Sequence, residues 1–193
     1  MQVTLIRHGS TAGNLRAAYI GRTDEELTPE GLRQAQEYAD PAVKKVYIST
    51  LRRTLQTAQA MFPKAQLVAE ADLNEMDFGT FEGKNYADLS PNPDSRAWVE
   101  GGCTGACPGG EDRAGFCRRV CAVFERIVRT ELEQGAEGAV FTVHGGTVMA
   151  IMEKYALPKG GFYDYAVKNC RGYIGQVRID EKGRLVITDL SEK

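Results

Sequence analysis

Short apolar segments alternate with amphipathic segments along the chain, and this alternation restricts the possible folds more than any other feature of the sequence. Runs rich in β-forming residues predict buried strands at 1–6, 43–48, 66–68 and 138–143. Apolar residues at helical spacing predict helices at 29–39, 49–62, 85–90 and 148–157, and a long one after residue 111. Two further segments, 173–179 and 184–189, are typical of a hairpin that closes one edge. This order predicts an α/β fold, a three-layer sandwich with a mostly parallel central sheet and helices on both faces.

Helix starts and inner faces follow from local patterns. Thr28 before Pro29 indicates an N-cap, and Ser49 is a second candidate cap. The expected inner faces are Leu32, Ala35 and Ala39 in the first helix, Leu51, Leu55 and Ala58 in the second, and Phe116, Val120, Val123, Phe124, Ile127, Val128 and Leu132 in the long helix. The segment 91–110, rich in proline and glycine, predicts a long loop that acts as a lid or a binding surface.

Length, charge and hydropathy narrow the functional classes. A chain of 193 residues can bury a stable apolar core without disulfides or a structural metal, so we expect one domain over residues 1–193. A net charge of −2 lacks the excess of positive charge that is typical of proteins that bind nucleic acid or an acidic membrane surface. No apolar run approaches the roughly 18 residues that a membrane span requires, and the first residues do not form an export signal. We therefore expect a cytoplasmic protein with neither nucleic-acid nor membrane partners.

Five cysteines, an odd number in a chain without an export signal, indicate thiols rather than disulfides. Cys103 and Cys107 are four residues apart, as are Cys117 and Cys121, so a zinc site is one alternative. The usual spacing of two residues between paired ligands is missing, and this favours core or loop thiols. We expect no metal.

The chain has only two histidines, and both stand directly after an apolar strand and before glycine. His8 follows Arg7, and His144 precedes Gly145 and Gly146. Ligands of open α/β sheets bind at the carboxyl ends of strands, which is where both imidazoles are expected. The alternative, a structural histidine beside a salt-bridged arginine, does not explain why the context occurs twice.

Two further segments carry charged candidates. Arg52 and Arg53 fall in the first turn of a predicted helix, where a cation opposes the helix dipole unless an anion lies nearby. The segment 72–83 mixes acids with large apolar residues, so one carboxyl group can lie against an apolar wall with a raised pKa. A solvated arginine and a solvated acidic loop are the alternatives.

Five motifs in order resemble the histidine phosphatase superfamily, the phosphoglycerate-mutase-like family, from residue 1 to about 157. They are Arg7-His8-Gly9 with Thr11 and Asn14; Gly21-Arg22-x-Asp24 with Leu27-Thr28-x-x-Gly31; Ser49-x-Leu51-x-Arg53-x-x-Gln56-Thr57-Ala58; Glu75-x-Asp77-Phe78-Gly79-x-Phe81-Glu82-Gly83; and His144-Gly145-Gly146. Within the family the chain is most similar to small phosphatases, including α-ribazole-phosphate phosphatases, which share a counterpart of 108–111. It departs at Thr50 and Thr54, where proline and alanine are common.

The resemblance implies a role for each matching residue. His8 would be the nucleophile that becomes a phosphohistidine, and Glu75 would be the general acid, with Glu82 as the next candidate. The implied substrate-binding residues are Arg7, Asn14, Gly21, Arg53, His144 and Gly145. A neutral imidazole is a competent nucleophile near pH 7, and guanidinium groups suit the charge on a transferring phosphoryl group. The resemblance implies no metal or other cofactor.

The implied activity is hydrolysis of a small-molecule phosphate monoester, with α-ribazole phosphate, and so cobalamin biosynthesis, as a candidate. A phosphoglycerate mutase is the first alternative, but mutases of the family generally carry extra sequence between the acid and the second histidine. A phospho-ligand binding module without turnover is the second, and the presence of both His8 and Glu75 argues against it. The physiological substrate stays open, as does the choice between monomer and homodimer.

Overall fold

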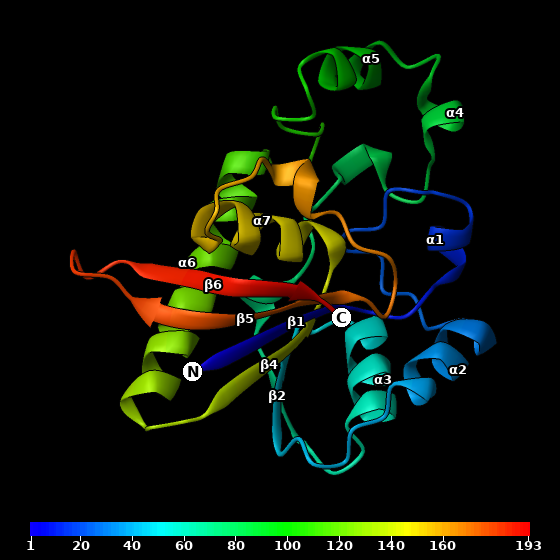
Figure 1. Ribbon diagram of the computed structural model, residues 1–193. Coiled ribbons are helices and arrows are strands. Elements are labelled where there is room, and N and C mark those ends of the chain that lie inside the picture. The colour runs from blue at the N-terminus through cyan, green and yellow to red at the C-terminus, as the bar shows by residue number, and fades with distance from the viewer.

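A six-stranded sheet runs through the centre of the protein in the computed structural model, which describes residues 1–193 (Figure 1). Its strand order is β3-β2-β4-β1-β5-β6. The strands are β1 (Gln2–Arg7), β2 (Lys45–Ile48), β3 (Gln66–Ala69), β4 (Gly138–Val143), β5 (Gly172–Ile179) and β6 (Leu185–Glu192). The first four are parallel to one another, whereas β5 and β6 form the antiparallel edge. The mostly parallel sheet and the C-terminal hairpin are both confirmed.

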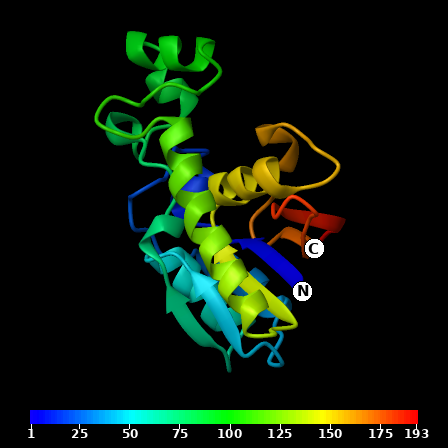
Figure 2. The ribbon, with the colours of Figure 1, turned by 90° about the vertical axis from the view of Figure 1, so that its left-hand side faces the viewer.

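Helices cover both faces of this sheet, and Figure 2 looks onto the face that the long helix crosses. They are α1 (Ala12–Leu15), α2 (Pro29–Glu37), α3 (Arg52–Met61), α4 (Tyr86–Leu89), α5 (Pro93–Glu100), α6 (Arg113–Glu133) and α7 (Gly145–Tyr155). Short 3₁₀ turns are η1 (Ala71–Leu73), η2 (Gly79–Phe81) and η3 (Phe162–Tyr165). No helix is long and apolar enough to span a membrane.

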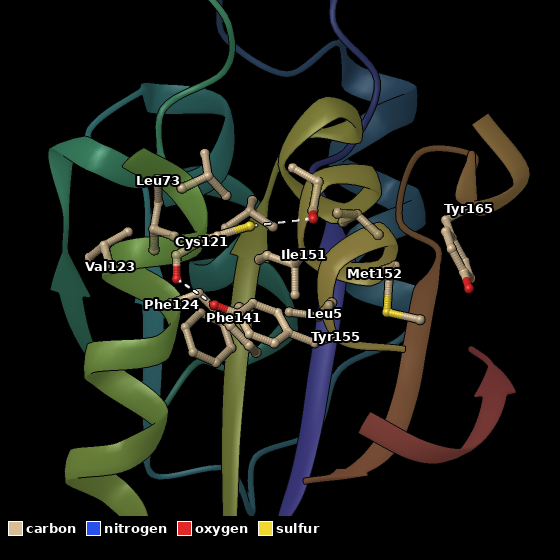
Figure 3. Close-up of a cluster of buried hydrophobic side chains, with 14 of the residues drawn as sticks. Leu5, Leu73, Cys121, Val123, Phe124, Phe141, Ile151, Met152, Tyr155 and Tyr165 are labelled. Atoms are coloured by element: carbon tan, nitrogen blue, oxygen red, sulfur yellow. Dashed lines mark hydrogen bonds between the residues drawn. The ribbon is translucent and has the colours of Figure 1, made fainter. Parts of the chain in front are cut away.

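Two apolar cores lie on opposite faces of the sheet because successive strand side chains alternate in direction. In β1, Leu5 belongs to the larger core with α6 and α7, while Ile6 belongs to the smaller core with α2 and α3. In the larger core the ring centroid of Phe124 lies 5.2 Å from that of Phe141 and 5.4 Å from that of Tyr155 (Figure 3). Each such ring contributes about 1.5–3 kcal/mol by leaving water, so the strands are held firmly from both sides.

The first predicted helix begins as expected but presents a different inner face. The Thr28 hydroxyl accepts the Gly31 N–H at 3.0 Å, which confirms the cap. Leu32 and Ala39 are exposed, and the buried positions are Gly31 and Ala35. Two small residues at this contact let the helix lie close to the loop after β1, and a leucine there would not fit.

Helix α3 begins three residues later than predicted. Ser49 does not cap it, because the N-cap is Leu51 and makes no side-chain bond. Leu55 is exposed, and the buried positions of the helix are Arg53, Thr54, Thr57, Ala58 and Met61. The polar side chains Arg53, Thr54 and Thr57 are buried because they form hydrogen bonds with other polar groups of the protein. A pattern based on apolar residues alone does not detect such positions.

Two other boundaries differ. Helix α7 begins at Gly145, three residues before its predicted start, with His144 as the N-cap residue. In the long helix, Leu132 is only partly buried, while Cys121 and Glu131 join the predicted buried stripe. Glu131 is buried because Lys45 and Tyr47 bond its carboxylate.

The segment predicted as a long loop contains helix α5. The Asn92 side chain accepts N–H groups of Asp94 and Ser95, and Pro93 occupies the first turn, so local capping overrides the loop-like composition. Residues 84–110, which we name the cap, project beyond the sandwich (Figures 1 and 2). The indole of Trp98 donates to the Gly105 carbonyl at 2.9 Å and ties the cap together.

Candidate active site

The two histidines meet at the carboxyl edge of the sheet. Strands β1 and β4 are parallel neighbours in which Arg7 pairs with Val143, so the next residue of each strand emerges at the same level. The ring centroids of His8 and His144 lie 5.2 Å apart at an interplanar angle of 66°. The predicted juxtaposition of the two imidazoles is present.

His8 is held in one tautomer. Its Nδ1 lies 2.7 Å from the Gly9 carbonyl oxygen, which can only accept, so Nδ1 carries the proton. Nε2 has no protein partner. Burial, followed by the charge of Arg53, lowers the pKa of His8 well below its ordinary value, so the ring is neutral near pH 7. A free lone pair on Nε2 is the form that a nucleophile requires.

His144 is bonded through both nitrogens. Its Nδ1 accepts the Arg53 Nε–H at 3.2 Å, so its Nε2 carries the proton and donates to the Ser49 hydroxyl at 2.8 Å. Burial and the charge of Arg53 lower the pKa of His144 well below its ordinary value. The ring is completely buried and holds the Nε of Arg53.

Two guanidinium groups lie near His8 without a carboxylate in ion-pair contact. Arg7 donates to the Val167 carbonyl at 2.8 Å, but its buried Nε has no partner. Arg53 is fully buried and donates to the carbonyls of Thr23 and Gly21, each at 2.8 Å. Burial lowers the pKa of both arginines, yet guanidinium groups stay charged. This pocket therefore carries positive charge that no protein anion neutralises by direct contact.

Glu75 brings a carboxyl group to the same place from the acidic segment. It accepts the Gly146 N–H at 2.9 Å and the Met76 N–H at 3.0 Å. A Cβ at Gly146 would lie 2.3 Å from Glu75 Oε1, so a side chain there would displace this carboxylate. Burial raises the pKa of Glu75 despite these bonds, which is the direction expected of a proton donor.

Glu82, the alternative acid, has a different environment. Burial alone would raise its pKa, but the Thr23 hydroxyl and backbone N–H groups of Arg22, Phe78 and Thr23 outweigh it and lower the pKa. Its carboxylate also accepts the Gly21 N–H. Glu82 thus organises the loop that carries Gly21, whose carbonyl in turn holds Arg53.

Asn14 is oriented by its neighbours. Its Oδ1 accepts the Thr11 N–H at 3.2 Å and the Asn169 amide at 3.1 Å, so its own amide nitrogen is left to donate. Asn169 also donates to the His8 carbonyl at 2.9 Å. Asn169 is absent from the sequence predictions and carries no local signal, because its partners lie more than 150 residues away.

The role of Ser49 also differs from the sequence prediction, because Ser49 supports His144 instead of capping a helix. Its hydroxyl accepts from His144 and lies 2.9 Å from the buried Thr54 hydroxyl, which donates to the Leu51 carbonyl. Thr54, one of the two departures from the family pattern, thereby belongs to the hydrogen-bond network behind the site. The motif that contains Ser49 was the available signal, but it also fitted a helix cap.

A cavity of about 370 Å³ joins several predicted site residues. Arg7, His8, Asn14, Glu75 and Gly145 line it, whereas Arg53, His144 and Gly21 do not. A more polar cavity of about 790 Å³ adjoins it and shares Arg7, Asn14 and Tyr19. Only the smaller one is lined by both His8 and Glu75, so it is the candidate reaction chamber.

The five cysteines are the remaining candidate ligands from the sequence. All five are free, and no three His, Cys, Asp or Glu side chains converge. Burial raises the pKa of Cys107 and Cys117 to about 11, so both thiols are protonated near pH 7.

Comparisons with known proteins agree with this geometry. The chain is similar to the 2,3-bisphosphoglycerate-dependent phosphoglycerate mutase of Cytophaga hutchinsonii, at 27% identity over 78% of this chain and 75% of the mutase. The structure matches the α-ribazole phosphatase of Shigella flexneri with a TM-score of 0.78 and 26% identity, covering 97% of this chain and 94% of that one. It also matches a protein of Thermus thermophilus, with a TM-score of 0.66, 29% identity and coverage of 96% and 97%.

The family model of the histidine phosphatase superfamily (branch 1) matches residues 3–188. Nearly the whole sheet, both histidine turns and the cap fall within that range. The chain therefore belongs to the histidine phosphatase superfamily, branch 1, whose enzymes act on phosphate esters.

Proposed function

We propose that this protein is a metal-independent phosphomonoesterase that hydrolyses a small-molecule phosphate through a phosphohistidine at His8. The observation that carries this proposal is the unpartnered, buried Nε of Arg7 beside a neutral imidazole whose Nε2 is free. A buried donor without a partner costs about 1–3 kcal/mol. A bound phosphoryl oxygen would supply that partner.

The first step is attack of His8 Nε2 on phosphorus, with departure of the alcohol oxygen on the opposite side. Charge spreads over the phosphoryl oxygens, and Arg7, the Asn14 amide and the Gly145 N–H, which line the cavity, would bind them. Arg53 adds charge from behind, fixed by His144. Both ring nitrogens of His144 are already hydrogen-bonded within the protein. We therefore assign His144 the role of positioning Arg53 rather than of binding the phosphoryl group directly.

Glu75 completes both steps. Protonated through its raised pKa, it gives its proton to the departing oxygen, and the resulting carboxylate then takes a proton from the water that attacks the phosphohistidine. The imidazole leaves phosphorus, inorganic phosphate is released, and Glu75 is protonated again for the next cycle.

We favour hydrolysis over mutase chemistry, with α-ribazole phosphate as the candidate substrate. The candidate substrate is supported by the structural match to the α-ribazole phosphatase of Shigella flexneri, at 26% identity over 97% of this chain. The short segment between Glu75 and His144 also leaves little chain to shield a phosphohistidine from water. Residues 1–193 would form one catalytic domain, since strands from both ends of the chain share the sheet.

The test compares phosphate release with isomerisation. Purified protein is incubated with α-ribazole phosphate and with 3-phosphoglycerate plus 2,3-bisphosphoglycerate, and the products are separated by chromatography. We expect inorganic phosphate and an acid-labile phosphoenzyme. Isomerisation that outpaces phosphate release would favour the mutase, and the absence of a phosphoenzyme with every phosphate ester would overturn the proposal.

A further inference from the structure

Glu75 lies on a stretch of chain that forms neither helix nor strand. Residues 74–78 connect η1 to η2, and no backbone hydrogen bond joins two residues of this stretch. A carboxyl group on such a stretch keeps a fixed place only if other parts of the protein hold its backbone. Two residues outside the stretch do so: Arg119 on α6, and Glu111 just before that helix.

Arg119 uses all five N–H groups of its guanidinium. Nη1 donates to the carbonyl oxygens of Asp72 and Asn74 at 3.0 and 2.8 Å, and Nη2 donates to that of Glu75 at 3.0 Å. The remaining N–H groups, on Nε and Nη2, donate to the two carboxylate oxygens of Glu111, each at 2.7 Å. Because a guanidinium is planar and rigid, the three carbonyls and the carboxylate are fixed relative to one another.

Glu111 holds the chain on the far side of Glu75. Its Oε2 also accepts the Asp77 N–H at 2.9 Å, and its own backbone N–H donates to the Asp77 carbonyl at 2.9 Å. The turn before Glu111 packs closely as well, because a Cβ on Gly110 would lie 2.3 Å from the Asp77 carbonyl oxygen. The backbone is therefore held on both sides of the acid.

The surroundings of the pair strengthen these contacts. Both side chains are only 22% exposed, so water and salt screen their attraction less than at the surface. The Arg119 guanidinium also lies over the Phe116 ring, 5.1 Å from its centroid. Both residues belong to α6, whose buried stripe is part of the larger core. The irregular stretch is thus tied to a firmly packed helix.

We propose that Arg119 and Glu111, which we name the acid clamp, are positioning residues that hold the Glu75 carboxyl group where it can protonate the leaving oxygen. The inference rests on the proposed function, since it takes Glu75 as the general acid. Neither residue lines the reaction chamber. A misplacement of about 1 Å can cost about 10²-fold in rate, so a loosened clamp should slow the step that needs this proton.

The experiment compares two esters of similar size whose leaving groups differ in their need for a proton. 4-Nitrobenzyl phosphate releases an alkoxide that must be protonated, whereas 4-nitrophenyl phosphate releases a phenolate that leaves without a proton. We measure kcat/KM for phosphate release, which reports formation of the phosphoenzyme. The proteins are the unmodified chain, Arg119→Lys, Glu111→Gln, Glu75→Gln, and each clamp variant combined with Glu75→Gln.

The clamp variants are conservative. Arg119→Lys keeps the charge but loses the planar fork, and Glu111→Gln keeps the shape but loses the charge. We expect each to lower kcat/KM about 10- to 50-fold for the nitrobenzyl ester and about threefold or less for the nitrophenyl ester. In the Glu75→Gln background each should cost less than about threefold on both esters, because the acid that the clamp positions is absent.

A loss in the clamp variants that is equal on both esters, or undiminished in the Glu75→Gln background, would overturn the clamp, since it would reflect general damage to the site. Arg129 provides the matched control, because it pairs with Glu125 on the same helix at 2.7 Å and lies outside the reaction chamber. Arg129→Lys should change the ratio of the two kcat/KM values less than about twofold. A change as large as that of Arg119→Lys would also overturn the clamp.

Glu75→Gln alone distinguishes the two failures. Equal losses on both esters in this variant would mean that Glu75 is not the general acid, and the proposed role of Glu75 would fail together with the clamp. A selective loss in Glu75→Gln that appears in neither Arg119→Lys nor Glu111→Gln leaves the proposed function standing and overturns the clamp alone.

Discussion

The turns after β1 and β4 are built alike and surrounded differently. Each runs from a buried strand through a histidine and glycine into a helix, at the same edge of the sheet. His8 leaves Nε2 free at the cavity, whereas His144 uses both nitrogens within the protein. The same local sequence therefore yields one imidazole available for chemistry and one that holds another residue in place.

The source of the difference is the neighbouring element. His8 bonds only its own loop through Gly9, while His144 lies between Arg53 and Ser49, which both belong to the segment that follows β2. β4 lies beside the parallel strand β2, which ends at the same edge of the sheet and continues into Ser49 and Arg53, whereas the second neighbour of β1 is the antiparallel strand β5. The parallel neighbour that ends at the same edge therefore supplies the hydrogen-bond partners of the His144 ring, and β1 has no such neighbour on its other side.

The largest expected effect separates the two histidines directly. His8→Ala should lower phosphate release by at least about 10⁴-fold and abolish the phosphoenzyme, since the nucleophile is lost. His144→Ala should lower the rate by about 10²-fold, as expected when a positioned charge is disturbed, and should still form phosphoenzyme. Quench-flow labelling with a radioactive phosphate ester measures both. Labelled His8→Ala protein would show that another nucleophile operates.

Glu75 links the two turns, because its carboxyl group contacts Gly146 and lines the same cavity as His8. Glu75→Gln should lower kcat on alkyl phosphates by about 10²–10³-fold, since general acid catalysis is lost. Aryl phosphates, whose alcohols leave without a proton, should be affected about tenfold or less. Steady-state assays on both classes give the comparison, and equal losses on both would move the acid elsewhere.

The adjacent residues Arg52 and Arg53 test how much the charge held by His144 contributes to catalysis. Arg53 is buried against His144, while Arg52 is exposed and paired with Asp24 and Glu26. Arg53→Ala should reduce kcat/KM by about 10²-fold or more, and Arg52→Ala by less than about twofold. Circular dichroism establishes that both variants are folded. Similar activities would show that the buried charge is not used.

A substitution at Ser49 perturbs the hydrogen bonds of His144 less than the loss of Arg53 does. Ser49→Ala removes the acceptor for the His144 Nε2 proton and should lower kcat by about five- to tenfold, the worth of one buried hydrogen bond. Ser49→Thr should restore most of it by keeping a hydroxyl. Nitrogen-15 NMR of the two imidazoles provides the second readout: only the His144 signals should shift, and a shift confined to His8 would contradict the assignment.

The smallest effect concerns stability against pH. Both histidines have lowered pKa values in the folded protein, so below about pH 6.5 the unfolded chain binds protons that the folded protein does not. Stability contributed by the neutral rings is therefore lost as pH falls through about 6.5. Glu75, with its raised pKa, acts in the opposite direction. Calorimetry should show a Tm that falls from pH 7 to pH 5, less steeply in His8→Asn, and an unchanged slope would contradict the lowered pKa of His8.

Much of this protein was determined by the sequence alone. Strand propensity at 138–143, the Thr28 cap and the two strand-His-Gly contexts act over a few residues, and so the α/β fold and the meeting of the imidazoles could be predicted. The larger core likewise follows from helical periodicity in α6, because burial of an amphipathic face is a local property of the sequence.

Only the tertiary structure determined that His8 keeps a free ring nitrogen while both ring nitrogens of His144 are hydrogen-bonded. The bonds of His144 to Ser49 and Arg53 span more than 90 residues, and those of Asn169 to His8 and Asn14 span more than 150. Hydrogen bonds depend on the angle and distance of atoms that only the folded sheet brings together, and no residue pattern encodes them. The same reason explains why Ser49 supports a histidine rather than a helix.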